Sequence, residues 1–183
     1  MTERWGLKYV QFCFDLLDPR TTVDARQAMA AKVREASAKY GFEVQSAFIG
    51  AGAYAYNLLL HPFPELRKDA LEWCRLTAVT AAELGAQGVG RPVAAASVKD
   101  YRDPGKHHFL KDTLVQGMRA FAHYAADRGL KFVCWEPTPI GPEILIHLDN
   151  AKELYERFKE RSSKGSHSVF VRVLRLSREE SPE

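Results

Sequence analysis

The sequence predicts an α/β fold in which helices cover a parallel sheet. Short runs of β-branched and aromatic residues alternate with longer stretches of helical spacing, and successive runs lie roughly 40 residues apart. Because one parallel strand can follow another only through a crossover, this order indicates right-handed βαβ units. A chain of 183 residues is long enough for one domain with its own core.

The predicted elements follow one another in a regular order. The strands cover residues 7–14, 43–49, 86–89 and 130–135, and the helices cover residues 23–40, 64–84, 108–128 and 149–161. The helix boundaries carry the expected signals, because Pro64 suits a first turn and Gly41 and Gly129 suit the position after a last turn. A polar loop of about fifteen residues follows the third strand, a length that is typical of functional loops.

Two architectures accommodate consecutive βα units, a doubly wound open sheet and a (β/α)₈ barrel. The open sheet needs a glycine-rich phosphate or dinucleotide motif after the first strand, whereas the segment FDLLDPR contains no glycine. A barrel needs polar groups at the carboxyl ends of its strands, where the sequence has Asp15, loops 50–61 and 91–103, and Glu136. The sequence therefore predicts a partial (β/α) barrel of the TIM type with about four βα units.

Glu136 is the strongest candidate for chemistry. It directly follows the apolar strand LKFVCW, and three prolines at 137, 139 and 142 stiffen the loop after it. A carboxylate held in one geometry at a strand end can bind a metal ion or remove a proton. The alternative is a glutamate that caps the next element or faces solvent, and the sequence alone leaves both interpretations open.

The overall composition excludes several classes of protein. The 26 basic and 23 acidic side chains are spread along the chain, so no nucleic-acid partner is expected. Cys13, Cys74 and Cys134 lie in apolar runs without a CxxC pair, which is typical of reduced, buried thiols in a cytoplasmic protein. The first residues lack a signal-peptide pattern, and no apolar run reaches the ~18 residues of a membrane span.

Four segments resemble a known family and come in the order expected for it. They read GLKYVQFCFDLLDP, GAYAYNLLLHPFPELRKDALEW, RPVAAASVKDYRDP and WEPTPIGPE. Together they are similar to the sugar phosphate isomerase/epimerase family with the xylose isomerase-like TIM barrel. Within it they most resemble the branch that acts on short ketose phosphates such as erythrulose phosphate. The resemblance runs from about Leu7 to about Arg161.

This resemblance implies a metal-dependent isomerase or epimerase that moves a proton through an enediolate. In the family the glutamate after the fourth strand binds a divalent cation and acts as an acid or base, and Glu136 matches it. Mn²⁺, Mg²⁺ or Co²⁺ would polarise the substrate oxygens, and a carboxylate would remove the neighbouring proton. Asn57, His61 and Glu143 are the expected contacts to a short ketose or ketose phosphate. The alternative for His61 is that it only satisfies backbone groups before a helix.

The sequence departs from the family after Arg161. The later metal ligands of the family, an aspartate, a histidine and a final glutamate, have no match, so most ligands are missing from this chain. We therefore expect residues 1–161 to be the N-terminal part of a barrel and residues 162–183 to be an atypical tail. Within that tail VFVRVLRL alternates as an edge strand does. Three explanations stay open: a truncated or out-of-frame chain, a complementing chain, or a homo-oligomer that closes the barrel.

Two other functions fit part of the pattern. The missing ligands would suit a catalytically inactive barrel fragment or a partner-binding remnant. Metal-dependent endonucleases use the same barrel type with a histidine-rich zinc site and a basic face, but the six histidines form no cluster at the strand ends. The expected function is therefore the isomerisation or epimerisation of a small sugar or sugar phosphate.

Overall fold

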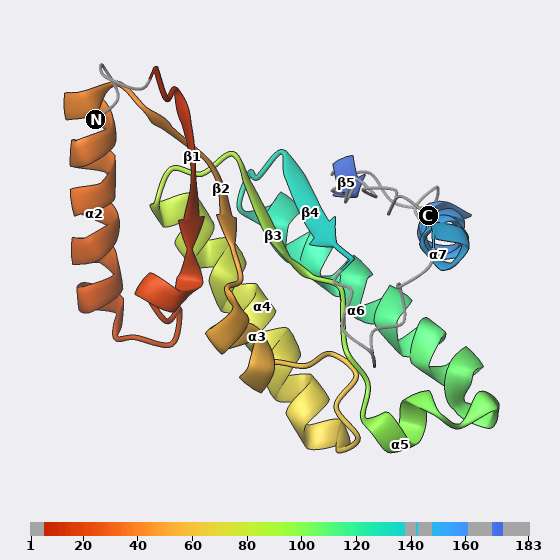
Figure 1. Ribbon diagram of the computed structural model, residues 1–183. Helices are drawn as coiled ribbons and strands as arrows, with labels where there is room; N and C mark the ends of the chain where they lie inside the picture. Colours follow the sequence, from red (N-terminus) through yellow and green to blue (C-terminus); the bar gives the residue numbers. More distant parts are fainter. Residues whose placement is uncertain (1–5, 138–141, 143–147, 161–169, 174–183) are drawn as a thin grey trace, which may run out of the picture.

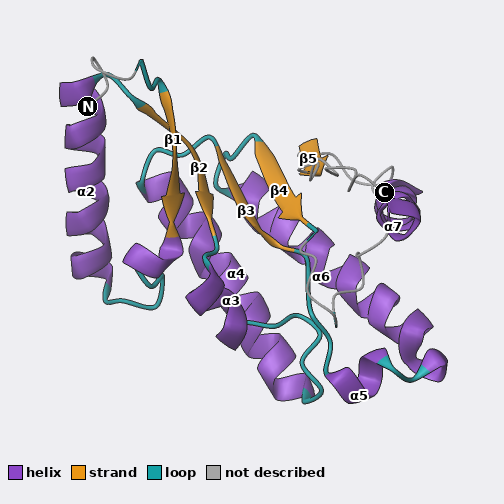
Figure 2. Ribbon diagram, in the orientation of Figure 1, coloured by secondary structure: helices purple, strands orange, loops and turns teal. Residues whose placement is uncertain are grey.

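The chain forms a series of strand–helix units. The computed structural model describes residues 6–137, 142, 148–160 and 170–173. The strands are β1 (Tyr9–Cys13), β2 (Glu43–Phe48), β3 (Gly88–Pro92), β4 (Phe132–Glu136) and β5 (Phe170–Val173). The helices are α2 (Val23–Tyr40), α3 (Ala51–Tyr56), α4 (Pro64–Glu83), α5 (Val98–Tyr101), α6 (His107–Asp127) and α7 (Leu148–Glu160), with 3-10 turns η1 (Phe14–Leu16) and η2 (Pro104–Lys106). This alternation confirms the predicted α/β fold (Figure 1, Figure 2).

The strands form one parallel sheet in the order β1-β2-β3-β4-β5. Each strand lies beside its predecessor, as in a barrel wall, whereas a doubly wound sheet reverses its order at a switch point. Figure 1 shows α4 and α6 behind the strands and α2 alongside β1. Helices on one side of a sequentially ordered parallel sheet confirm the predicted partial barrel.

The main core lies between the sheet and its helices. Val89, Val133 and Trp135 on the strands pack with Trp73, Ala78, Leu114 and Phe121 on α4 and α6, all of them buried. The rings of Phe121 and Trp135 meet edge to face, with centroids 5.7 Å apart. Burial of each large apolar side chain contributes about 1.5–3 kcal/mol, so this layer is the main source of stability.

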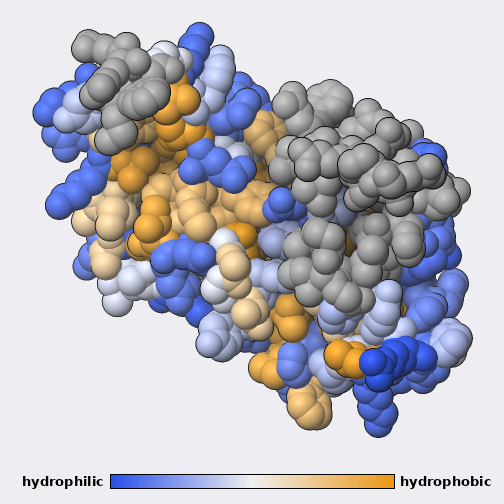
Figure 3. All heavy atoms as spheres, viewed as in Figure 1, coloured by the Kyte–Doolittle hydropathy of each residue, from blue (hydrophilic) through white to orange (hydrophobic). Residues whose placement is uncertain are grey.

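The opposite face of the sheet carries a second, smaller apolar cluster of Phe48, Phe132 and Cys134. Two glycines of β3 leave room for it, because a Cβ atom at Gly88 would lie 2.3 Å from the Phe132 ring and one at Gly90 would lie 2.5 Å from the Phe48 ring. Figure 3 shows further apolar residues over β1 and β2 on this face, away from α4 and α6. It is the face that a closed (β/α)₈ barrel would enclose.

The long elements agree with the sequence prediction, and the short ones account for the differences. Helix α2 has the predicted bounds and ends at Gly41, whose φ of 68° is left-handed. The strand predicted over residues 86–89 lies instead at Gly88–Pro92, since Arg91 continues the strand as a buried residue. The expected loops contain α3, α5 and η2, which are too short to show a helical period in the sequence.

The fifth strand comes from the segment that we expected to be an atypical tail. β5 pairs in parallel with β4, from Phe132 with Phe170 to Trp135 with Val173. It occupies the edge of the sheet, where the alternation of VFVRVLRL had placed a strand. Among the residues that the structure describes, no helix combines the length and the apolar character needed to cross a membrane.

Candidate functional site

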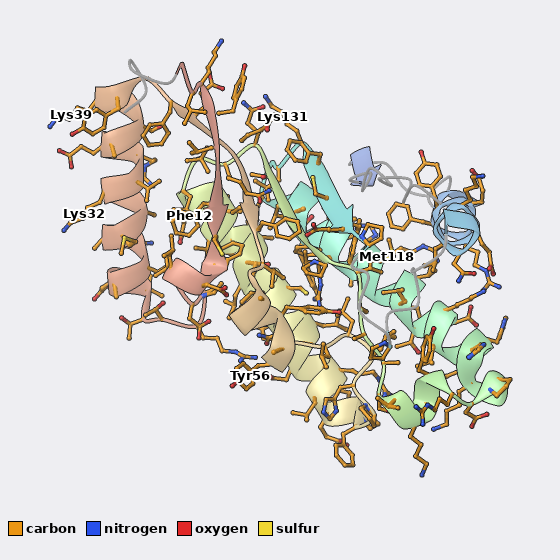
Figure 4. All side chains as sticks on the ribbon, viewed as in Figure 1. Phe12, Lys32, Lys39, Tyr56, Met118 and Lys131 are labelled. Atoms are coloured by element: carbon orange, nitrogen blue, oxygen red, sulfur yellow. The ribbon has the colours of Figure 1, made fainter. Side chains whose placement is uncertain are left out.

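The carboxyl ends of the parallel strands meet at one edge of the sheet, and the candidate residues lie there. Asp15 follows β1, Asn57 and His61 follow β2, and Glu136 ends β4. Tyr56 on α3, labelled in Figure 4, lies at this end of the sheet, whereas Lys131, just before β4, lies at the other end. In (β/α) barrels this is the edge that carries active sites.

Glu136 is the last residue of β4 and is half-buried. It pairs with Pro92 of β3, and its backbone carbonyl accepts a hydrogen bond of 3.0 Å from the N–H of Val93. Because side chains alternate along a strand, Glu136 shares the face of Phe132 and Cys134, which is opposite the face that packs on α4 and α6. The neighbouring strand therefore fixes the backbone that carries the candidate carboxylate.

Asn57 follows α3 and is buried, with 3% of its surface exposed. Its side-chain Nδ2 donates to the carbonyl of Ala53 at 2.7 Å, and its backbone carbonyl accepts from Nη2 of Arg91 at 2.9 Å. The buried Oδ1 atom has no hydrogen-bond partner among the described residues. A buried amide oxygen without a partner is costly, so a ligand hydroxyl at this position would be stabilised.

His61 is half-buried where the chain enters α4. Its Nδ1 accepts a hydrogen bond of 3.1 Å from the backbone N–H of Phe63. An imidazole whose Nδ1 is an acceptor carries its proton on Nε2 when neutral, so Nε2 is the donor. His61 thus does satisfy a backbone group, as the structural alternative supposed, and keeps one donor for a further contact.

Asp15 has a structural task at this edge. Its Oδ1 atom accepts a hydrogen bond of 3.0 Å from the N–H of Ala53, in the first turn of α3. The approach is close, because a Cβ atom at Gly50 would lie 2.2 Å from Oδ2 of Asp15. Asp15 therefore serves as a cap for the start of α3.

Two residues of the polar loop after β3 are also structural. Ser97 caps α5, because its Oγ accepts a hydrogen bond of 3.0 Å from the N–H of Asp100. The ammonium group of Lys106 and the Ser97 hydroxyl lower the pKa of Asp100 below its ordinary value, since both favour the charged carboxylate. Asp100 therefore stays ionised and holds Lys106.

The described residues do not form a metal centre. No three histidine, cysteine, aspartate or glutamate side chains gather closely enough within the described part of the chain to hold an ion. Glu143, the second carboxylate expected in the site, lies outside the described residues. One carboxylate does not hold a catalytic divalent cation, which usually has three or more protein or substrate ligands, so the residues present do not fit the metal.

Three cationic residues at this edge were missed by the sequence analysis. Arg91 is a fully buried residue of β3, while Arg67 and Lys106 line a small cavity beside His61. Arg91 had a detectable signal, because a single charge inside the apolar segment GVGRPVAAA indicates a buried and hydrogen-bonded group. Arg67 and Lys106 had none, since the two residues come from different helices and meet only through the fold.

Comparison with known proteins shows which proteins the chain resembles. No known protein-family profile matches the sequence. The D-erythrulose 1-phosphate 3-epimerase of Brucella abortus is 25% identical over 151 residues, which are 82% of this chain and 48% of the epimerase. The chain is similar to xylose isomerase-like sugar epimerases. Because only 48% of the Brucella epimerase is matched, the chain spans about half the length of this curated relative.

Solved structures agree with this similarity. A protein from Rhodospirillum rubrum, provisionally named a xylose isomerase, superposes with a TM-score of 0.85 at 26% identity, covering 94% of this chain and 57% of that one. A D-psicose 3-epimerase superposes with a TM-score of 0.68 at 16% identity, covering 93% of this chain and 53% of that one. The resemblance to xylose isomerase-like sugar epimerases that the sequence indicated is confirmed, with a chain that covers about half of each barrel.

Proposed function

We propose that this chain acts in the isomerisation or epimerisation of a short ketose or ketose phosphate by proton transfer. The observation that carries the proposal is the position of Glu136, a half-buried carboxylate at the carboxyl end of β4. The same edge carries the substrate-contact candidates Asn57 and His61. The similarity to sugar epimerases, among them one that acts on D-erythrulose 1-phosphate, supports this class of substrate.

The chemistry follows from the acidity of a C–H bond that lies beside a ketone carbonyl. A carboxylate within reach of that proton can remove it, and the electrons of the C–H bond move into the carbonyl to give an enediolate. Return of the proton to the opposite face of the same carbon gives the epimer, and return to the neighbouring carbon gives the isomer. Glu136 is the proposed base that removes the proton, and on its own face it can also return the proton to the neighbouring carbon. Epimerisation needs in addition an acid on the opposite face of the enediolate, which Glu136 alone cannot supply.

The neighbouring polar groups would orient the substrate. Oδ1 of Asn57 can accept a hydrogen bond from a sugar hydroxyl, and Nε2 of neutral His61 can donate one to a sugar oxygen. Both residues are held through backbone contacts, which reduces the entropy lost when the substrate binds. Glu143 is a third proposed contact, supported by the family resemblance alone.

The divalent cation implied by the resemblance would be Mn²⁺, Mg²⁺ or Co²⁺, with Glu136 as one ligand. Because the described residues supply no ligand cluster, further ligands would have to come from elsewhere, such as a complementing chain or a second copy in a homo-oligomer. No step of the proposal depends on the cation. We also propose a cytoplasmic location, supported by three cysteines that form no disulfide.

Solvent deuterium exchange tests the proposal directly. The purified protein is incubated in D₂O with erythrulose and with erythrulose 1-phosphate, with and without added Mn²⁺, and proton loss next to the carbonyl is followed by NMR. We expect deuterium incorporation by the wild type and a decrease of about 10²-fold or more in Glu136→Gln. Glu43→Gln changes a glutamate at the opposite end of the sheet and should exchange as the wild type does. Absence of exchange by the wild type under all conditions would refute the proposal.

A second candidate is a catalytically inactive fragment that binds a partner. The absence of a ligand cluster among the described residues favours it. The exchange experiment separates the two candidates, since an inactive fragment with an intact fold gives no deuterium incorporation with or without metal.

A further inference from the structure

A small cavity opens beside the substrate-contact candidate His61. It lies where the start of α4 meets the corner formed by α5, η2 and α6. Its lining includes His61, Arg67, Asp100, Lys106, Phe109 and Thr113. The cavity volume is about 110 Å³, somewhat less than the ~150 Å³ of a protein cavity that holds benzene. The cavity therefore has room for one small group and none for a whole sugar.

Arg67 enters this cavity in a fixed position. Its Nη1 donates to the backbone carbonyls of His61 at 2.8 Å and Pro62 at 3.1 Å, and its guanidinium carbon lies 5.6 Å from the centre of the Phe109 ring. Nε and Nη2 donate to no other described residue. A guanidinium held through one nitrogen and an aromatic face keeps two parallel N–H donors, which is the geometry that binds an oxyanion bidentately.

Lys106 supplies a second cation on another wall of the cavity. Its ammonium group pairs with Asp100, a buried residue in the capped turn of α5. An ammonium has three N–H donors, and Asp100 accepts from one of them. Asp100 therefore positions the lysine and leaves two N–H donors for a ligand. His61 adds the neutral Nε2 donor. The side chains of Arg67, Lys106 and Asp100 leave a net charge of +1 in the cavity.

We propose that this cavity is a binding site for a tetrahedral oxyanion, the phosphoryl group of a phosphorylated ligand. Several fixed N–H donors, an excess of positive charge and a volume for one small group are the properties that select such an anion. As a subsite for the substrate, the cavity would rest on the proposed function, because it lies on the same edge of the sheet as Glu136. As an anion site, it stands on its own geometry.

Isothermal titration calorimetry of the full chain at constant ionic strength tests the site. The probes are inorganic phosphate, glycerol 1-phosphate and glycerol. We expect saturable binding of both phosphates and none of glycerol. Arg67→Gln and Lys106→Gln should each weaken phosphate binding by about tenfold or more, the usual effect of losing a charge-assisted hydrogen bond. Arg75→Gln is the matched control, since Arg75 lies on the same helix and pairs with Glu72 outside the cavity.

The outcomes are distinct. Tighter binding of glycerol 1-phosphate than of inorganic phosphate would indicate an organic phosphate as the natural ligand, and equal or weaker binding would indicate the free anion. The site is overturned if the wild type binds neither phosphate, or if Lys106→Gln and a folded Arg67→Gln both bind as the wild type does. If phosphate does not bind, the deuterium-exchange experiment with unphosphorylated erythrulose can still give a positive result. Loss of the anion site is therefore distinguishable from loss of the proposed function.

Discussion

Arg91 on β3 and Asn57 after α3 are joined by a buried hydrogen bond, in which Nη2 of the arginine donates to the asparagine carbonyl at 2.9 Å. The same guanidinium donates from Nη1 to Sγ of Cys74 on α4 at 2.9 Å and from Nε to the carbonyl of Pro92 at 3.1 Å. Its carbon lies 5.9 Å from the centre of the Tyr54 ring. One fully buried side chain thus connects a strand end, a helix and the segment that carries the proposed substrate contacts.

Arg91→Leu should therefore destabilise the protein strongly. Leucine keeps part of the volume but leaves the carbonyls of Asn57 and Pro92 without their donor, at a cost of about 2–4 kcal/mol in the free energy of unfolding. Urea denaturation followed by circular dichroism measures this change. Arg75→Gln, which breaks an exposed ion pair, should stay within about 0.5 kcal/mol of the wild type. Equal stability of Arg91→Leu and the wild type would show that the buried guanidinium contributes no net stabilisation.

Gly50→Ala and Gly52→Ala should differ although the two glycines are neighbours. A Cβ atom at Gly50 would lie 2.2 Å from a carboxylate oxygen of Asp15, whereas one at Gly52 would lie 3.4 Å away, at ordinary contact distance. Gly50→Ala should displace Asp15 from the N–H of Ala53 and cost about 1 kcal/mol, the usual value of a helix cap. Gly52→Ala should be neutral or stabilising, since alanine favours the helix.

Thermal unfolding of both variants measures this difference. The cost of Gly50→Ala should largely vanish when Asp15 is already replaced by alanine, because the close contact and the cap are then both absent. A cost that persists unchanged in the Asp15→Ala background would contradict the explanation.

The sequence predicted the long elements well because their signals are local. α2 begins and ends as predicted since Asp24 and Gly41 mark its two ends. The short α3 was not predicted, because its stability depends on the Asp15 carboxylate from a distant part of the chain. The extension of β3 to Pro92 was not predicted for a similar reason. A charged residue such as Arg91 is typical of a loop, and only the fold supplies its buried partners Cys74 and Asn57.

The candidate site was predictable in part. The position of Glu136 at the end of an apolar strand was predictable, and β4 does end there, while its role stays a prediction. The hydrogen bonds of Asn57 and His61 could not, because they involve backbone atoms whose positions depend on the path of the loop. The cavity of Arg67 and Lys106 was also inaccessible to sequence reasoning, since it forms only where two helix starts meet.

The contact between α6 and α7 should depend on pH. Lys111 donates to Glu153 at 2.5 Å and Arg157 lies 2.8 Å from the same carboxylate, and these two cations hold the pKa of Glu153 below its ordinary value of 4.5. As the pH falls below that value, the unfolded chain binds the proton first, so this pair's contribution to stability is lost as pH falls through the folded pKa. As the pH falls from about 5 to below the folded pKa of Glu153, the wild type should therefore lose more stability than Glu153→Gln, measured by urea denaturation.

Glu35→Gln is the control for this measurement, because the exposed Glu35 on α2 forms no ion pair with another described residue. Its stability should follow the pH dependence of the wild type. A Glu153→Gln variant with that same dependence would exclude the ion pair as the origin of the effect.

The three cysteines should react with a thiol reagent in a fixed order. Cys13 on β1 is partly exposed, whereas Cys74 and Cys134 are buried. Burial raises the pKa of the Cys74 thiol, even though Arg91 opposes the shift, and the thiolate is the reactive form. Titration of the folded protein with Ellman's reagent should show one fast thiol, and the other two should react only after unfolding in urea. Cys13→Ser should remove the fast phase, whereas a fast phase that survives this change would show that the sheet opens far enough in the native state to expose Cys74 or Cys134.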